Sequence, residues 1–257
     1  MRPVTHVLTS VYRHIVGLAR LRDEDVWLAS FPRSGSTWVR TILLNTMLCV
    51  EGEPAASGST PHFLELLPNY GFSDLSQPWP FSCVPRIIKT HRRFNRALSR
   101  PRATIYIIRD PRDSAVSYFD FLAKHKGHRY RGDFSSFLRH SGYGLEASIL
   151  HYLSWQSRIT YLLRYEKLCT DPFHEFVRLF AALGWEIPEK ALVQGVESST
   201  LEKMRQVEEA RGPISRFDSD FRVVRSGGTG HWQKEFDSAD LRYFRQLCET
   251  HSYDCYS

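Results

Sequence analysis

Several features are absent from this sequence of 257 residues, and each absence narrows the class of protein. No apolar run approaches the roughly 18 residues that a membrane-spanning helix needs, so we expect no membrane span. The five cysteines are scattered, odd in number and without the close pairing of metal sites, which favours a reducing, cytoplasmic location. The sequence has no internal repeat or low-complexity tract, and because no convincing domain boundary interrupts it, we expect one domain over residues 1–257.

Acidic residues are fewer than basic ones, 28 against 34, which gives a net charge of +6. This excess predicts an anionic partner, and nucleic acid, a membrane surface or a phosphorylated small molecule would each fit. Residues 1–24 carry apolar side chains at helical spacing, interrupted by arginines. This pattern predicts an amphipathic helix packed on the domain, with membrane-surface binding as the alternative, and it argues against a secretory signal.

Short apolar runs alternate with helical patterns along the chain. The predicted strands are Asp25–Ser30, Pro85–Thr90, Ala103–Arg109 and Thr160–Tyr165. The predicted helices are Thr37–Val50, Arg112–Lys126, Leu145–Arg158 and Pro172–Leu183, the last closed by Gly184. This alternation predicts an α/β fold whose central, mostly parallel sheet is flanked by helices on both faces. Two long irregular stretches, 51–84 and 208–235, remain, and we expect the second to act as a lid over a bound ligand.

The segment Phe31–Asn45, FPRSGSTWVRTILLN, lies where the first predicted strand turns into a helix. Such a turn presents free backbone N–H groups and the positive end of the helix dipole. Gly35 permits close approach of the backbone to an anion, the neighbouring hydroxyls add donors, and Arg33 adds a fixed charge. The stretch 32–38 is therefore predicted to hold a phosphate-like group.

Other nucleotide- and nucleic-acid-binding classes fit less well. The loop lacks the G-x-x-x-x-G-K-[ST] pattern with which kinases and NTPases hold a nucleotide and magnesium, although this class remains the alternative. The acid that could bind a metal, Asp110, stands between Arg109 and Arg112, so we expect no metal site. A binding module for nucleic acid has some support in scattered arginines, but no nucleic-acid-binding motif is present.

Four stretches, in this order, resemble the motifs of sulfotransferases that use 3′-phosphoadenosine 5′-phosphosulfate (PAPS), in particular the cytosolic family. They are FPRSGSTWVR (31–40), PRIIKTH (85–91), RDPRDSAVSY (109–118) and RSGGTGHW (225–232). Tyr165–Glu166 and the run Ser199–Met204 are similar to two further family motifs. The resemblance covers nearly the whole chain and implies a P-loop-like, three-layer α/β fold that needs no metal.

The resemblance also implies roles for individual residues. Around the 5′-phosphosulfate it places Arg33, Ser34, Gly35, Ser36 and Thr37. At the 3′-phosphate it places Arg109, Ser117, Arg225, Ser226 and Gly227. Around adenine it places Trp38, Tyr165, Ser199 and Leu201. The catalytic set is His91 as general base for an acceptor hydroxyl, with Lys89 and Arg33 stabilising charge.

The sequence departs from the cytosolic family at three places. Arg33 stands where cytosolic members have lysine, although carbohydrate sulfotransferases use arginine there. Ser226 replaces a usual lysine, and the residues after Trp232 lack the family's dimer segment, so that dimer is not predicted. The implied acceptor is a hydroxyl of a small molecule, glycan or lipid, and the implied product of the nucleotide is adenosine 3′,5′-bisphosphate (PAP).

Overall fold

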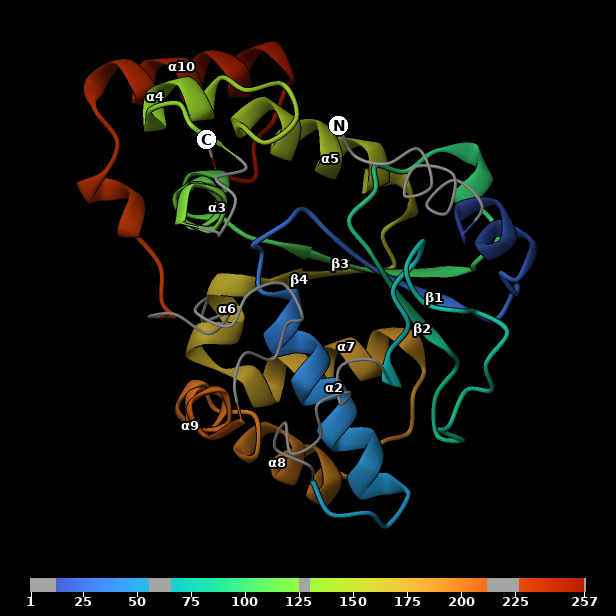
Figure 1. Cartoon of the computed structure of the whole chain (residues 1–257). Coiled ribbons are helices and arrows are strands. Elements are labelled where there is room, and N and C mark those ends of the chain that lie inside the picture. Colours follow the sequence, from blue (N-terminus) through green and yellow to red (C-terminus); the bar gives the residue numbers. More distant parts are fainter. Residues whose placement is uncertain (1–12, 56–65, 125–129, 212–226, 257) are drawn as a thin grey trace.

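The computed structural model describes residues 13–55, 66–124, 130–211 and 227–256 (Figure 1). Its centre is a four-stranded sheet in the order β2-β1-β3-β4, in which every neighbouring pair is parallel. The strands are β1 (Val26–Ser30), β2 (Ile87–Thr90), β3 (Ala103–Ile108) and β4 (Tyr161–Arg164). Each is a short run dominated by apolar side chains, as expected of strands covered on both faces.

Helices cover both faces of this sheet (Figure 1). One face carries α2 (Ser36–Val50), α6 (Tyr165–Thr170), α7 (Pro172–Leu183), α8 (Glu189–Glu197) and α9 (Leu201–Arg211). The other carries α3 (Pro111–Lys124), α4 (Phe134–Leu138), α5 (Leu145–Trp155) and α10 (Ser238–Thr250). The predicted three-layer α/β fold is therefore confirmed.

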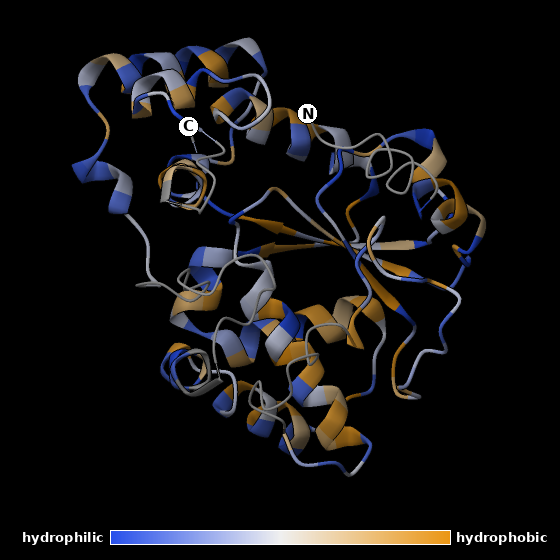
Figure 2. Cartoon of the chain, in the orientation of Figure 1, coloured by the Kyte–Doolittle hydropathy of each residue, from blue (hydrophilic) through white to orange (hydrophobic). Residues whose placement is uncertain are grey.

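Successive side chains of β1 divide between two hydrophobic cores, because residues alternate across a strand. Val26 and Leu28 join the core beneath α2, α7 and α8, whereas Trp27 and Ala29 join the core beneath α3, α5 and α10. Figure 2 shows the same arrangement as hydrophobic strands and hydrophobic inner sides of the surrounding helices. The strand is thus held rigidly between two packed layers.

The strand order creates a switch point at the carboxyl end of the sheet, between its two inner strands β1 and β3. The chain leaves β1 through α2 on one face, and it leaves β3 through α3 on the other (Figure 1). Since β1 and β3 are neighbours, their carboxyl ends lie at the point where the connections change face, which is where ligands bind in open α/β sheets. The predicted anion-binding loop follows β1, and Arg109 follows β3.

Element boundaries differ from the predictions in several places. Helix α7 and its left-handed end at Gly184 (φ 66°) are confirmed, and the strands are shorter by one or two residues at their ends. The irregular stretch expected from residue 208 is wrong at its start, because α9 continues to Arg211, and residues 231–234 form a 3-10 turn. Five helices, α4, α6, α8, α9 and α10, were not predicted; α9, for example, is rich in charge and lacks a clear apolar stripe.

Near the N-terminus, helix is present from residue 13 to 19, and residues 1–12 lie outside the described part. The helix lies against the loop that carries Tyr70, since a side chain at Gly17 would come within 3.1 Å of that ring. Its predicted extension to residue 24 is wrong, because the helix ends at residue 19 and the Arg22 N–H then donates to Asp25 in a turn. Among the described residues, no helix is long and apolar enough to cross a membrane.

Candidate active site

The loop between β1 and α2 has the backbone geometry of an anion-binding turn. Arg33 and Gly35 both adopt positive φ, 70° and 94°, so the chain reverses sharply before α2 begins. A side chain at Gly35 would meet the Tyr165 ring at 2.5 Å, which leaves room only for glycine. No side chain caps the start of α2 and no acidic residue lies in its first turn, so its free N–H groups face no competing carboxylate there.

Arg33 connects this loop to α3. Its Nε donates to the Ser117 hydroxyl at 3.1 Å, and its guanidinium carbon lies 5.3 Å from the centre of the Phe121 ring. Ser117 was predicted to bind the 3′-phosphate and Arg33 the 5′ end. The structure therefore brings the two predicted phosphate-binding groups together, one from the β1–α2 loop and one from α3.

His91 follows β2 and is oriented by the end of β1. Its Nδ1 lies 2.7 Å from the backbone oxygen of Ser30. Because a carbonyl oxygen only accepts hydrogen bonds, Nδ1 carries the ring proton, and Nε2 of the neutral ring is left with the lone pair. Burial, and then the nearby charge of Lys89, hold the pKa of His91 well below its usual range, so the neutral form prevails at neutral pH.

Lys89 lies on β2, two residues before His91, and acts on it electrostatically. Its backbone N–H donates to Pro68 and its carbonyl accepts from Tyr70, which fixes this edge strand. Burial first, and then the positive charges of Arg40 and Arg33, lower the pKa of Lys89 to about 7. The amine is therefore poised between its two protonation states near neutral pH.

Arg109 lies at a junction of three segments. Its Nη1 donates to the Arg33 carbonyl and its Nη2 to the Gly228 carbonyl, each at 3.2 Å, while its guanidinium stacks 4.4 Å from the centre of the Tyr165 ring. Its Nε is buried and has no hydrogen-bond partner among the described residues. An arginine held in this way retains donor capacity for an anion.

The four residues expected around adenine lie close to one another. The Trp38 indole donates to the Ser199 carbonyl at 2.8 Å and meets the Tyr165 ring edge to face, with ring centres 6.1 Å apart. The Ser199 hydroxyl is fully buried and already bonded to Gly195 and Asn45. Leu201 packs against Gly227, where an added side chain would collide with it.

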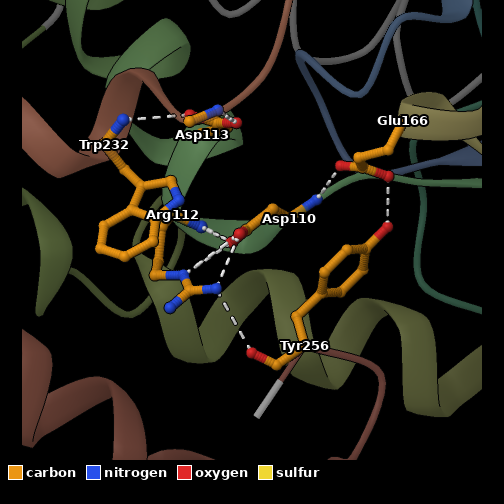
Figure 3. Close-up of polar contacts among 7 residues, drawn as sticks. Asp110, Arg112, Asp113, Glu166, Trp232 and Tyr256 are labelled. Atoms are coloured by element: carbon orange, nitrogen blue, oxygen red, sulfur yellow. Dashed lines mark hydrogen bonds and ion pairs between the residues drawn. The ribbon is translucent and has the colours of Figure 1, made fainter. Parts of the chain in front are cut away.

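Sequence reasoning missed the role of Asp113 at this site. Its two carboxylate oxygens accept the backbone N–H groups of Gly230 at 2.7 Å and of Trp232 at 3.0 Å (Figure 3). The motif RDPRDS contains this aspartate, but an acidic residue in the first turn of a helix is usually explained by the helix dipole. Two predicted members of the late loop, Arg225 and Ser226, lie outside the described residues.

Sequence reasoning also missed a buried histidine. The Tyr106 hydroxyl is bonded to Nδ1 of His151 at 2.8 Å, and the His151 ring lies 5.8 Å from that of Phe31. Burial lowers the pKa of His151 to about 4, so it is neutral and packs as a polar core residue. No sequence motif distinguishes it from other histidines on helices.

The candidate metal-binding acid is fully engaged. Arg112 bonds both carboxylate oxygens of Asp110, through Nε at 2.9 Å and Nη2 at 2.8 Å (Figure 3). Within the described ranges, no group of three or more histidine, cysteine or acidic side chains could hold a metal ion. The positive charge of the site comes from side chains.

Comparison with known proteins identifies the family. The family model for the Sulfotransferase domain matches residues 23–255, nearly the whole chain. The chain belongs to the sulfotransferase family. The resemblance inferred from the motifs is thereby confirmed. The family found is neither the kinase or NTPase class nor a nucleic-acid-binding module, the two alternatives considered from the sequence.

Among characterised relatives of this sulfotransferase is cattle Sulfotransferase 1A1, which is 26% identical over 245 residues, covering 86% of this chain and 81% of the relative. The mouse protein of the same name is 27% identical over 241 residues, with 86% and 82% covered. These alignments span most of both chains, so the similarity extends well beyond the phosphate-binding motifs.

Solved structures share the fold. A mouse sulfotransferase, SULT7A1, crystallised with PAP, superposes with a TM-score of 0.68 at 20% identity, covering 95% of this chain and 92% of that one. Retinol dehydratase, in complex with androsterone and inactive cofactor PAP, gives 0.67 at 21% identity, covering 97% and 85%. A putative steroid sulphotransferase from Arabidopsis thaliana gives 0.59 at 18% identity, covering 96% and 83%.

Proposed function

We propose that this sulfotransferase transfers the sulfuryl group of PAPS to an acceptor hydroxyl, with His91 as general base. The observation that carries the proposal is the hydrogen bond between His91 Nδ1 and the Ser30 carbonyl, 2.7 Å long. This hydrogen bond holds the imidazole at the last residue of β1, directly before the anion-binding loop. Nε2 is then available as a base. Membership of the family and the PAP bound in related structures support the choice of nucleotide.

The residues present fit such a nucleotide. The free N–H groups of the β1–α2 loop and the hydroxyls of Ser34, Ser36 and Thr37 suit the 5′ end, and the positive φ of Gly35 keeps the loop free of side-chain bulk. Arg109 lies 76 positions after Arg33 in the sequence. Its Nε, which has no hydrogen-bond partner among the described residues, offers a donor for a second phosphate. When bound, PAPS supplies a sulfuryl group attached to a phosphate leaving group.

In this mechanism His91 takes the proton of the acceptor hydroxyl through Nε2. Its low pKa in the free protein arises from burial and from Lys89, and an adjacent anion would raise it again. Lys89, protonated by the same effect, neutralises negative charge that develops at the leaving oxygen, and Arg33 supplies fixed charge that no proton transfer removes. Catalysis then consists of positioning, charge stabilisation and one proton transfer, the logic of phosphoryl transfer without a metal.

The acceptor in this proposal is a small molecule, glycan or lipid that carries a hydroxyl group. The protein works in the cytoplasm, in keeping with its five cysteines, all of which are free thiols. The rest of the sequence-based assignment, namely a single domain with a lid near residues 208–235 and adenine contacts from Trp38, Tyr165, Ser199 and Leu201, remains a prediction.

Thermal-shift and calorimetric titrations test the nucleotide assignment. PAP should raise the melting temperature and bind equally well with EDTA present, whereas ATP–Mg²⁺ and single-stranded DNA should have little effect. Labelled PAPS incubated with a library of phenols, alcohols and sugars should then transfer its label to some hydroxyl acceptor. Stabilisation by ATP–Mg²⁺ alone would favour the kinase class, and a strict magnesium requirement for PAP would contradict the metal-free mechanism.

A further inference from the structure

Asp113 lies at the start of α3 and is only 1% exposed. One carboxylate oxygen accepts the Gly230 N–H and the other accepts the Trp232 N–H, across more than 110 positions of sequence (Figure 3). A carboxylate has no donor of its own, so both oxygens are matched to backbone donors. Gly230 itself adopts positive φ, 81°, which turns the chain so that both N–H groups reach the same side chain.

Arg112 holds the same segment by its side chain. Its guanidinium lies 4.0 Å from the centre of the Trp232 ring and donates three hydrogen bonds to the carboxylate of Asp110. Two neighbouring residues on α3 therefore hold Trp232: Asp113 binds its backbone N–H, and Arg112 stacks on its indole. We call this arrangement of Asp110, Arg112, Asp113, Gly230 and Trp232 the loop anchor.

The loop anchor is connected to the predicted 3′-phosphate site on both sides. Asp113 stands four residues, about one helical turn, before Ser117, so both lie on one side of α3. On the loop side, the Gly228 carbonyl, two residues before Gly230, accepts a hydrogen bond from Arg109 at 3.2 Å. The position of Gly228, and with it the orientation of Arg109, depends on where the loop is held.

We propose that Asp113 is a positioning residue for the 3′-phosphate of the nucleotide. It fixes residues 228–232 against α3 and thereby aligns Arg109 with its phosphate, while touching neither nucleotide nor acceptor itself. This inference rests on the proposed function, since it requires a nucleotide with a 3′-phosphate. The competing explanation is that Asp113 only stabilises the first turn of α3 through the helix dipole.

Asp113→Asn separates the two explanations. Asparagine keeps the shape but has one acceptor oxygen, and its NH₂ group would face a backbone N–H, so at least one anchor bond is lost. We expect the dissociation constant for PAP to rise by about tenfold or more, and that for adenosine 5′-phosphosulfate, which lacks the 3′-phosphate, to change by less than about twofold. Asp240→Asn is the matched control, because Asp240 is also buried, also in the first turn of a helix, and bonded to Ser135 and Arg139 away from the loop.

A second variant approaches the anchor from the loop. Gly230→Ala should strain the positive φ and produce the same loss for PAP alone, and Gly184→Ala is its control, because Gly184 also has positive φ (66°) at a helix end with open space around it. Equal losses for both ligands, or no loss in a folded Asp113→Asn protein, would overturn the positioning role. Failure of the unmutated protein to bind PAP would instead contradict the proposed function, so the two failures are distinguishable.

Discussion

Two regions of the candidate active site differ in how their charges are balanced. The first region, which we call the loop end, lies at the β1–α2 loop and consists of Arg33, Lys89 and His91. Positive charges there lower the pKa values of their neighbours: Arg33 contributes to lowering the pKa of Lys89 to about 7, and Lys89 lowers the pKa of His91. At the loop anchor, each charged side chain has a partner. Asp110 binds Arg112, and Asp113 binds two backbone N–H groups.

A further acid extends the balanced region. Glu166, at the start of α6, accepts the Asp110 N–H at 2.9 Å and the Tyr256 hydroxyl at 2.5 Å, and the Tyr256 carbonyl accepts from Arg112 (Figure 3). Strand end, helix and C-terminal segment are thus joined by mutually satisfied groups, which makes a rigid scaffold. The loop end keeps an excess of positive charge that a bound anion would offset. In the proposed mechanism the reacting groups therefore lie in the positively charged region, and the balanced region holds the surrounding segments in place.

The largest effect is expected from removing the base at the loop end. A general base typically contributes about 10²- to 10⁴-fold to rate, so His91→Ala should lower kcat by roughly that factor. The dissociation constant for PAP should stay within about threefold, a change of less than 1 kcal/mol. Steady-state kinetics and calorimetry on the same preparation measure both quantities.

The control for this variant is His174→Ala, which removes a solvent-exposed histidine on α7 that is bonded to Asp171 and lies edge to face with the Phe173 ring. It should behave as the unmutated protein. Near-normal turnover of His91→Ala on an unactivated alcohol would remove His91 from the mechanism. If His91→Ala lost PAP binding, His91 would belong to the phosphate-binding residues. The loop end would then serve nucleotide binding and not proton transfer.

A smaller effect is expected at Arg109, which donates to the Gly228 carbonyl next to the loop anchor. Arg109→Ala removes a charge-assisted contact to a phosphate, which is worth on the order of 2 kcal/mol, or about 30-fold in affinity. Adenosine 5′-phosphosulfate should bind almost unchanged, because Arg109 is proposed to contact only the 3′-phosphate. Titrations of both ligands test this, with Arg100→Ala, which breaks an exposed ion pair with Asp23, as the control. Equal weakening of both ligands would make Arg109 a structural residue.

The sequence predicted the loop end better than the loop anchor, for a physical reason. Arg33 and Gly35 lie within one short motif, and a glycine with neighbouring hydroxyls after a predicted strand is enough to indicate an anion-binding turn, although the positive φ of Arg33 has no signal in its residue type. Lys89 lies on β2 and His91 follows directly after its last residue, so the two-residue spacing of an extended chain predicts that both side chains lie on one face. Parallel-strand order then brings the ends of β1, β2 and β3 to one edge, as expected from alternating strands and helices.

The loop anchor joins residues that are more than 110 positions apart, and no local pattern encodes that pairing. Asp113 lies inside the motif RDPRDS, but its role in holding the late loop cannot be predicted from the sequence. Its partners are backbone N–H groups, which every residue type except proline has. Helix α10 was missed although Asp237 caps it by accepting the Asp240 N–H. The site residues themselves remain predictions, since sharing a fold does not measure what each one binds.

The smallest effect concerns stability and tests the excess charge at the loop end directly. The pKa of Lys89, about 7 in the folded protein, lies below the ordinary value of 10.5. Between these values the unfolded chain binds a proton that the folded chain lacks, so this group makes the free energy of unfolding rise with pH. Below pH 7 both states are protonated, and the full cost of burying the cation beside Arg33 and Arg40 acts on the folded state.

Lys89→Met removes that cost while filling a similar volume. Its melting temperature should exceed that of the unmutated protein by a few degrees at pH 6, on the order expected for a modest gain in a domain of this size, and by less at pH 9. Lys190→Met, at an exposed position on α8, should show no such trend. Saturating PAP should shrink the advantage of Lys89→Met, because a bound anion stabilises the charged lysine that the variant lacks. A melting temperature that falls equally at both pH values would mean that Lys89 is already compensated in the free protein, and the contrast between a charged loop end and a neutralised anchor would then disappear.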